Sequence, residues 1–298
     1  IAGGTTFDDN AYFRQKMAYD VWNSLNPLRQ QIESMFAVVY LDGIYHGLYA
    51  LVSRVDGEWW EDNGFREDGN LYKSVDHAAN FYAEYGGPKA SIHQGWEKKE
   101  GLPEDDFSDL DELIGFVIDA SDDEFDAQIG DRMALEDIYD WWALVVFIQG
   151  DDSGGKNAYL YNDPLAPKWH HAPWDFNYSF GQTWQTARVQ PYANWDFTGW
   201  NGLFARLLSS ETYREPMRER FAQHRAGMLQ SAQLQALIDS YTERIDASAR
   251  RDGAKWGGAY QTYEGWNWRD DWTTYDEEVA YIREWVDQRA VFVEEGDP

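Results

Sequence analysis

Apolar positions in the first hundred residues predict one helix followed by strands. Residues 35–41 and 44–55 are rich in β-branched and aromatic residues, and the Asp-Gly dipeptide between them is a hairpin turn signal. Residues 70–73 predict a further short strand that ends in a lysine. Before the hairpin, apolar residues recur every four positions and predict a helix whose buried face is formed by Phe13, Met17, Val21 and Leu25.

Three other residues of this region carry specific expectations. Arg14 and Lys16 lie off the apolar stripe of the first helix, so we expect them to be solvated. Gly47 interrupts the second hairpin strand. A glycine in this position marks either a β-bulge or a close approach by a ligand or another element.

The chain after residue 105 follows mainly helical spacing. Ser121 and Glu124 form a predicted capping box, and the helix expected at 134–148 is apolar nearly all round at its end, which indicates burial. Two short strands, residues 158–161 and 168–172, interrupt the helical pattern. Further helical stretches lie at residues 110–118, 203–245 and 275–293.

This order of elements predicts an α+β fold. We expect residues 1–105 to form a small, strand-rich N-terminal lobe and residues 106–298 a larger, mostly helical C-terminal lobe, with a cleft between them. A chain of 298 residues is long enough for such a two-lobed domain.

The charge balance excludes several classes of partner. The chain has 53 acidic and 25 basic residues, which gives a formal net charge of -28. Nucleic acids and anionic membranes are bound by clustered Lys and Arg, so neither is expected as a partner. The acidity fits adaptation to high salt or attraction for cations and basic proteins. No stretch reaches the roughly 18 apolar residues of a membrane span. The first residue is Ile, so we expect a processed form or a fragment.

The candidate chemistry lies at mid-chain. Asp152 and Asn157 fall in loop 149–157, and Asp175 falls in loop 172–181, directly after the second short strand. Metal-assisted phosphoryl transfer needs such a set: one acid orients the attacking hydroxyl, while the amide and the other acid hold magnesium on the phosphates. On spacing alone, two polar turns around a hairpin are the simpler interpretation.

The order of these residues is also that of a protein kinase. Kinases place an Asn five residues after the catalytic Asp, a second metal-binding Asp one hairpin later, and a lysine on an upstream strand, where Lys73 fits. The His-Arg pair before the catalytic Asp and the Gly-rich loop are missing, which excludes an ordinary protein kinase. Lys156 either contacts the transferred phosphate or is a loop charge. His170 and His171 suggest zinc, but neighbours on a strand point to opposite faces.

Several segments together resemble the spore-coat protein H (CotH) kinase family, from about residue 7 to about residue 260. They are Phe13-Arg-Gln-Lys-Met-Ala-Tyr-Asp20, Leu41-Asp-Gly-Ile-Tyr-His-Gly-Leu-Tyr-Ala-Leu-Val52, Gly69-Asn-Leu-Tyr-Lys73, Asp152-Ser-Gly-Gly-Lys-Asn-Ala-Tyr-Leu-Tyr161 and Pro173-Trp-Asp-Phe-Asn-Tyr-Ser-Phe-Gly181.

This resemblance implies an atypical, secreted, bilobal kinase fold that binds ATP with Mg²⁺, or alternatively Mn²⁺. It implies phosphorylation of Ser or Thr on secreted or cell-surface proteins. In these terms Asp152 is the catalytic acid, Asn157 and Asp175 are metal ligands, and Lys73 contacts the nucleotide. Lys156, beside Asn157, is kept as a further candidate for contact with the nucleotide.

The chain departs from the family in three places. Ser53 stands where the family usually has Glu, so the ion-pair partner of the nucleotide lysine is open, with Glu97 or Glu100 as candidates. Asn177 replaces a common second acid, which weakens the expectation of a second metal. An upstream Arg-Gly-Asn motif of the family is absent.

Two hypotheses of different classes follow. The first is a phosphotransferase that uses ATP and modifies a Ser/Thr-rich, basic acceptor protein. The second is a surface binding or adhesion protein on a kinase-like scaffold, with Trp-rich loops as the contact. The first is favoured, because a pure binding protein has no need to keep Asp152, Asn157 and Asp175 together.

Overall fold

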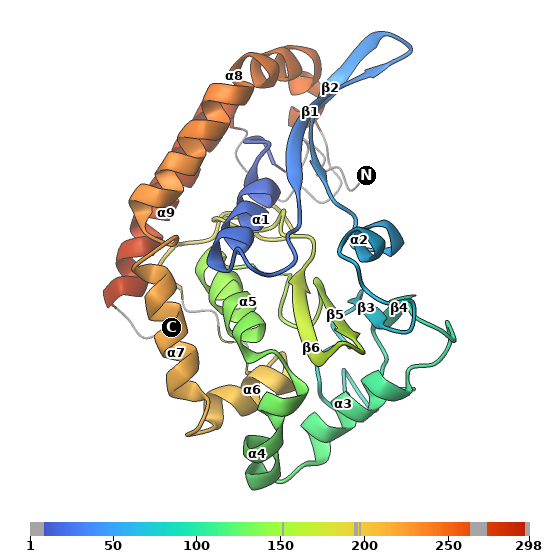
Figure 1. The fold of residues 1–298 in the computed structure, drawn as a ribbon. Coiled ribbons are helices and arrows are strands. Elements are labelled where there is room, and N and C mark those ends of the chain that lie inside the picture. Colours follow the sequence, from blue (N-terminus) through green and yellow to red (C-terminus); the bar gives the residue numbers. More distant parts are fainter. Residues whose placement is uncertain (1–8, 151, 194–195, 197, 263–272, 296–298) are drawn as a thin grey trace.

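The computed structural model describes residues 9–150, 152–193, 196, 198–262 and 273–295, and it confirms the α+β prediction (Figure 1). The strands of the described part are β1 (Ser34–Leu41), β2 (Ile44–Val52), β3 (Asn70–Ser74), β4 (Trp96–Glu100), β5 (Ala158–Asp163) and β6 (Ala166–Pro173). The helices are α1 (Arg14–Leu25), α2 (Gly57–Asp62), α3 (Ser108–Asp119), α4 (Asp122–Arg132), α5 (Leu135–Ile148), α6 (Gly202–Ser209), α7 (Arg214–Arg225), α8 (Ser231–Gln261) and α9 (Tyr275–Glu295).

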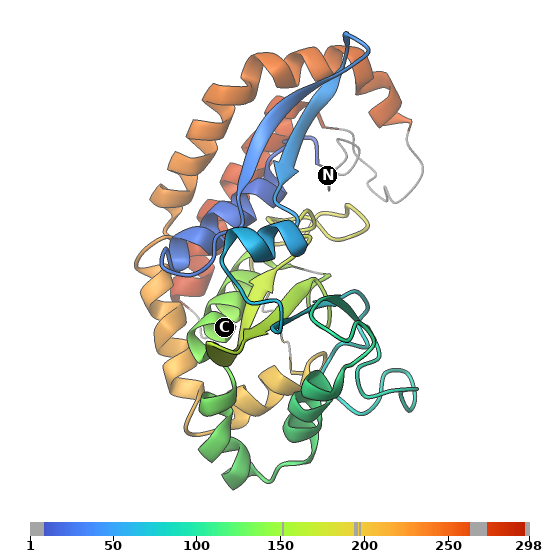
Figure 2. The ribbon, with the colours of Figure 1, turned by 45° about the vertical axis from the view of Figure 1, so that its right-hand side comes forward.

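The predicted hairpin is present as the antiparallel pair β1 and β2, which lies beside α8 (Figures 1 and 2). The register shifts between Val39 and Tyr40, so His46 on β2 has no partner across the hairpin and forms a bulge. The next residue, Gly47, lies against α8, because a Cβ added there would be 2.9 Å from Oδ1 of Asp252. The glycine therefore marks both a bulge and a close approach by another element.

The second sheet joins strands from both sides of residue 105. Its order is β4-β3-β5-β6, and all neighbours are antiparallel. Lys73 near the end of β3 lies opposite Tyr159 near the start of β5, where loop 149–157 ends. The sheet thus brings the candidate lysine and the candidate catalytic loop together. The division into two lobes at residue 105 stays a prediction.

Helix α5 lies in the interior and leads directly into loop 149–157. Every residue from Asp137 to Ile148 is buried, as the apolar composition of the helix predicts. The helix packs against α1, α7 and β6. It ends where Gln149 adopts a left-handed backbone conformation, with φ of 50°.

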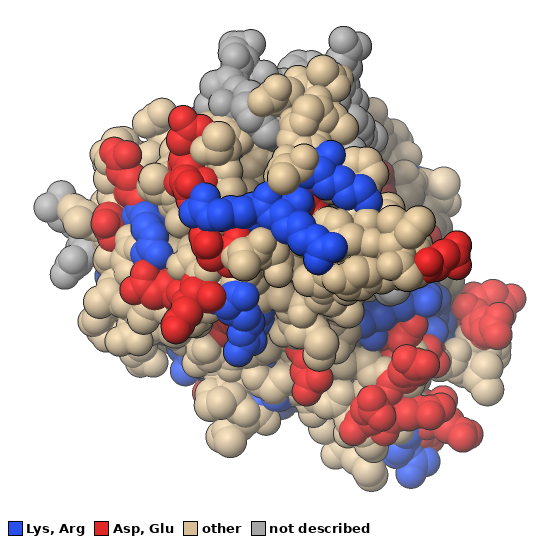
Figure 3. Space-filling view, turned by 90° about the horizontal axis from the view of Figure 1, so that it is seen from above, with Lys and Arg blue, Asp and Glu red and all other residues tan. Residues whose placement is uncertain are grey.

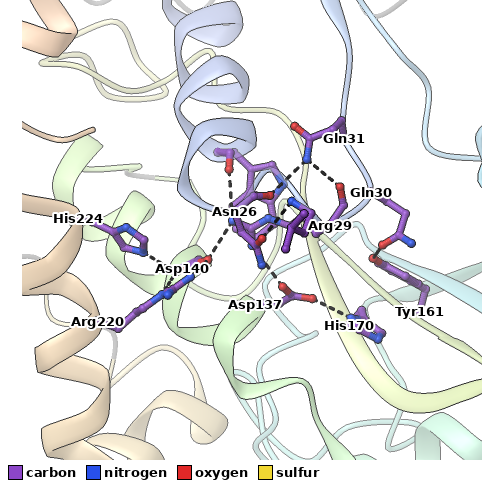
Figure 4. Close-up of polar contacts among 12 residues, drawn as sticks. Asn26, Arg29, Gln30, Gln31, Asp137, Asp140, Tyr161, His170, Arg220 and His224 are labelled. Carbon is purple, nitrogen blue, oxygen red and sulfur yellow. Dashed lines mark hydrogen bonds and ion pairs between the residues drawn. The ribbon is translucent and has the colours of Figure 1, made fainter. Parts of the chain in front are cut away.

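A buried ionic network fastens α5 to its neighbours (Figure 4). Arg29, which follows α1, donates hydrogen bonds to Asp137 (3.3 Å) and to Asp140 (2.9 Å). Arg220 on α7 also donates to Asp140, at 2.7 Å. Burial alone would raise the pKa of Asp140, but hydrogen bonds from His224 and Arg220 hold that pKa below its ordinary value. The helix before the catalytic loop is therefore held at its N-terminal half by charges from two other elements.

The expectation that Arg14 and Lys16 are solvated was wrong. Arg14 is 0% exposed and donates to Asp9 (2.7 Å) and to Glu278 of α9 (2.6 Å). Lys16 is also buried, and its Nζ lies 2.9 Å from Oδ2 of Asp20. Helix α1 is enclosed on its polar side as well, and carboxylates from its own and distant segments neutralise both cations.

The acidic surplus is not spread evenly over the surface. Seen from above, Lys and Arg side chains cross the middle of one face, and Asp and Glu side chains lie around them (Figure 3). None of the helices in the described part combines the length and the apolar character needed to cross a lipid bilayer.

Candidate active site

The side chain of Asn157 contacts both of the acids that the sequence singled out, Asp152 and Asp175. Its Nδ2 lies 3.1 Å from the backbone oxygen of Asp152 and 3.3 Å from the Oδ2 of that residue. The same nitrogen lies 3.4 Å from the backbone oxygen of Asp175. Strands β5 and β6 separate Asp175 from Asp152 and Asn157 in the chain, yet the three residues lie together at one end of the sheet, as predicted.

The backbone of Asn157 holds the loop to the adjacent strands. Its φ of 63° lies in the left-handed region, which Asn adopts more readily than most residues. Its N–H donates to the carbonyl of Ser74 at 3.3 Å, and its own carbonyl accepts from Trp174 N–H at 3.0 Å. The end of β3, loop 149–157 and loop 172–181 are therefore joined through one residue.

Asp152 has partners on both carboxylate oxygens. Its Oδ2 lies 2.8 Å from Nζ of Lys156, and its Oδ1 lies 3.2 Å from Nε2 of His77. Burial by itself would raise the pKa of Asp152, but the hydrogen bonds from His77 and Lys156 lower it below its ordinary value. The side chain is therefore an ionised acceptor at neutral pH. Sequence reasoning missed His77, because its loop carries no motif.

Asp175 is held in a left-handed conformation, with φ of 57°. Its backbone N–H donates to the hydroxyl of Tyr19 on α1, at 3.1 Å. Tyr19 is fully buried, and burial raises the pKa of its hydroxyl above the ordinary value. Its neutral hydroxyl is thus a fixed support for the backbone that presents the second acid.

Lys73 lies beside this second loop, with its Nζ 4.0 Å from the ring centroid of Trp174. Burial and nearby Lys99 lower the pKa of Lys73, while Asp175 and Glu97 oppose them. Glu97 on β4 lies directly opposite Lys73 in the register. Of Glu97 and Glu100, the two candidate partners, Glu97 is therefore the one whose charge acts on Lys73, although its carboxylate is paired with Lys99 at 2.5 Å.

A cavity of about 300 Å³ opens next to Lys73. Its walls combine cations with aromatic and apolar side chains, a combination that suits a ligand with an anionic part and a flat or apolar part. They are formed by Val52, Arg54, Val55, Asp56, Lys73, Lys99, Tyr159 and Trp174.

The oxygen atoms near the acids fit a hard cation such as Mg²⁺. The amide nitrogen of Asn157 is used by Asp152 and Asp175, while its amide oxygen accepts no hydrogen bond from the described residues. Oδ1 of Asn177 is buried and has no hydrogen-bond partner in the described part of the chain. Amide and carboxylate oxygens are ligands that Mg²⁺ accepts.

The two adjacent histidines of β6 face different surroundings. Nδ1 of His170 lies 2.7 Å from Oδ2 of Asp137, at the buried ionic network (Figure 4). His171 is buried, and its ring centroid lies 4.7 Å from that of Trp141. The side chains point to opposite faces, as the strand geometry predicts, and cannot share one metal.

Comparison with known proteins identifies relatives of the whole chain. A family model described as CotH kinase protein matches residues 5–293. The chain is also similar to the inner spore coat protein H of Bacillus subtilis (strain 168). The two are 24% identical over 293 residues, which cover 97% of this chain and 76% of that protein.

Proposed function

The chain belongs to the CotH kinase protein family, and we propose that it is an atypical protein kinase that phosphorylates Ser or Thr hydroxyls of secreted or surface proteins with ATP. One observation carries the proposal: the side chain of Asn157 links the carboxylate of Asp152 to the loop that presents Asp175. A bilobal kinase-like arrangement of the α+β fold and a surface or coat location belong to the same proposal. The location is supported by the spore coat relative.

The nucleotide is proposed to bind in the cavity beside Lys73. Lys73 and Lys99 supply positive charge for the phosphates, and Trp174 and Tyr159 supply aromatic surface for the base. Arg54 in the same wall is paired with Asp56 (2.8 Å) and Lys99 with Glu97 (2.5 Å), so a bound phosphate would compete with these carboxylates for two of the cations. Glu97 lies opposite Lys73 on β4 and raises the pKa of the lysine, while its own carboxylate is paired with Lys99 at 2.5 Å.

Asp152 is proposed to act on the acceptor side. Its carboxylate accepts a hydrogen bond from the acceptor hydroxyl and takes its proton as the hydroxyl oxygen bonds to the γ-phosphorus. The bond between that phosphorus and the bridging oxygen of ADP breaks in the same transfer. Lys156, 2.8 Å from Asp152, stabilises negative charge on the phosphoryl group.

Asn157 and Asp175 are the residues proposed to hold magnesium, or manganese, through their amide and carboxylate oxygens. Such a bound ion neutralises phosphate charge and aligns the phosphates for in-line transfer. Asn177 offers a further neutral oxygen in place of a second acid.

A binding or adhesion function on the same scaffold is the second candidate. It is favoured by two large aromatic side chains at the surface, since Trp184 is 37% exposed and Trp200 is 52% exposed. An adhesion protein would not require ATP.

Incubation with γ-labelled ATP and Mg²⁺ tests the choice, with a Ser/Thr-rich basic protein as acceptor. We expect label on the protein itself or on the acceptor, and none with Asp152→Ala or Asp175→Ala. Equal label in both variants, or a parent chain that neither binds nor uses ATP, would exclude the kinase function.

A further inference from the structure

His77 contacts the candidate catalytic acid from a segment outside both predicted loops. Its Nε2 lies 3.2 Å from Oδ1 of Asp152, while Lys156 (2.8 Å) and Asn157 (3.3 Å) share the other oxygen. His77 is therefore the one partner of Oδ1 among the described residues. Without it, rotation of the carboxylate about the Cβ–Cγ bond would be opposed only by the contacts at Oδ2 among the described residues.

The position of His77 is set by its backbone rather than by its imidazole. Gly155 of the catalytic loop packs on the His77 carbonyl, and a Cβ added at this glycine would lie 2.6 Å from that oxygen. Ser74, three residues before His77, is joined to Ala158 by two hydrogen bonds of 2.9 Å. The Ser74 Oγ accepts from the Ala158 N–H and donates to the Ala158 carbonyl. These contacts persist when the imidazole is changed, so the side chain can be tested separately from the fold.

The surroundings also fix the tautomer of the ring. Nδ1 of His77 is buried and has no hydrogen-bond partner in the described part of the chain. A carboxylate only accepts hydrogen bonds, so the proton must lie on Nε2 and point at Asp152. The ring centroid of the exposed Trp200 lies 6.1 Å from that of His77, and the side chains of His77 and Asp152 are both partly buried.

We propose that His77 is a positioning residue, which holds Oδ1 of Asp152 in the orientation that receives the acceptor hydroxyl. This inference rests on the proposed kinase function. Strand β3 and the residues that follow it then contribute to the sites of both substrates. Lys73 lies at the nucleotide cavity, and His77, four residues later, orients the acid that acts on the acceptor.

Steady-state kinetics of two His77 variants test the role. His77→Ala removes the donor, and we expect kcat to fall roughly 10- to 100-fold, the usual effect of losing one hydrogen bond to a charged group. The KM for ATP should stay within about twofold. His77→Gln carries an amide N–H at a similar reach and should recover most of the loss.

His93→Ala is the matched control. His93 forms a comparable, partly exposed pair with Asp111, with Nδ1 2.8 Å from Oδ1, away from the catalytic loop. This variant should leave kcat unchanged. The inference is wrong if His77→Ala keeps the parent kcat, if Gln is as poor as Ala, or if only the KM for ATP changes. A parent chain without transferase activity would instead overturn the kinase function itself.

A second measurement does not depend on activity. Two-bond ¹H–¹⁵N NMR spectra of the labelled protein report which ring nitrogen carries the proton. We expect His77 as the Nε2–H tautomer in the parent, and a shifted tautomer balance in Asp152→Ala. A parent His77 protonated on Nδ1 alone would overturn the proposed contact.

Discussion

The side-chain nitrogen of Asn157 lies 3.4 Å from the backbone oxygen of Asp175, although β5 and β6 separate the two residues in the chain. The same nitrogen reaches the carboxylate of Asp152. One amide therefore sets the distance between the acid proposed for the acceptor and the acid proposed for the metal.

Replacing this amide should disable the site. We expect Asn157→Ala to lower phosphoryl transfer by roughly 100-fold or more, as when one preorganised stabilising group is removed. The variant should also need more Mg²⁺ for half-maximal rate. Asn162→Ala is the matched control, because this asparagine lies on β5, the strand that follows Asn157, and donates to Asp109 at 3.1 Å. Comparable losses in the two variants would argue against a special role for Asn157.

The position of Glu97 opposite Lys73, where its charge raises the pKa of the lysine, predicts a graded effect on nucleotide binding. Lys73→Met should weaken ATP binding by about tenfold or more, because a charge-assisted contact is lost. Glu97→Gln should weaken it by roughly two- to fivefold, since the Glu97 side chain is 53% exposed and solvent screens its effect on Lys73. Isothermal titration calorimetry measures both constants.

Glu100→Gln serves as the control for Glu97. Glu100 lies opposite Leu71 in the register, and a Cβ added at Gly57 would be 3.0 Å from its Oε1, so its carboxylate faces another region. We expect unchanged ATP affinity. If Glu100→Gln weakens binding more than Glu97→Gln does, the assignment of the lysine's partner is wrong.

The buried His171 should make the free energy of unfolding depend on pH. Burial lowers the pKa of His171 from 6.5 to about 3, so the folded protein keeps this imidazole neutral. The unfolded chain takes up a proton below pH 6.5 and the folded chain does not. The free energy of unfolding should therefore fall as the pH drops from 6.5 toward 3, by up to about 1.4 kcal/mol per pH unit from this residue.

Urea unfolding at pH 7 and pH 5 measures this contribution. His171→Phe removes the titrating group and keeps an aromatic ring against Trp141. The loss of stability between the two pH values should be smaller in the variant by about 2 kcal/mol. Equal losses in the variant and the parent would show that His171 is not held neutral.

Local patterns in the sequence were sufficient for the elements that depend on neighbours in the chain. The hairpin, the capping box of α4 and the buried α5 were predicted because each follows from turn chemistry, capping or periodicity. The convergence of Asp152, Asn157 and Asp175 was also predicted. That prediction rested on the order of the three residues, which lie on loops before and after two strands, and their contacts agree with it.

Contacts between distant segments were not predictable in this way. The roles of His77 and Tyr19 depend on a loop and a helix that meet the site only after folding. The burial of Arg14 depends on Glu278, 264 residues away. Helical periodicity assumes one solvated face, and a helix that is buried over most of its surface, such as α1, violates that assumption.

Asp152 is proposed to act in transfer of the γ-phosphate of ATP. Intact-mass spectrometry after incubation with ATP and Mg²⁺ tests it most directly, because it identifies the group transferred to the protein or to a Ser/Thr-rich acceptor. We predict the added mass of phosphate for the parent and for Asp111→Asn, and no addition for Asp152→Asn. An unchanged parent, an equal gain in Asp152→Asn, or the added mass of a nucleotide would contradict the account.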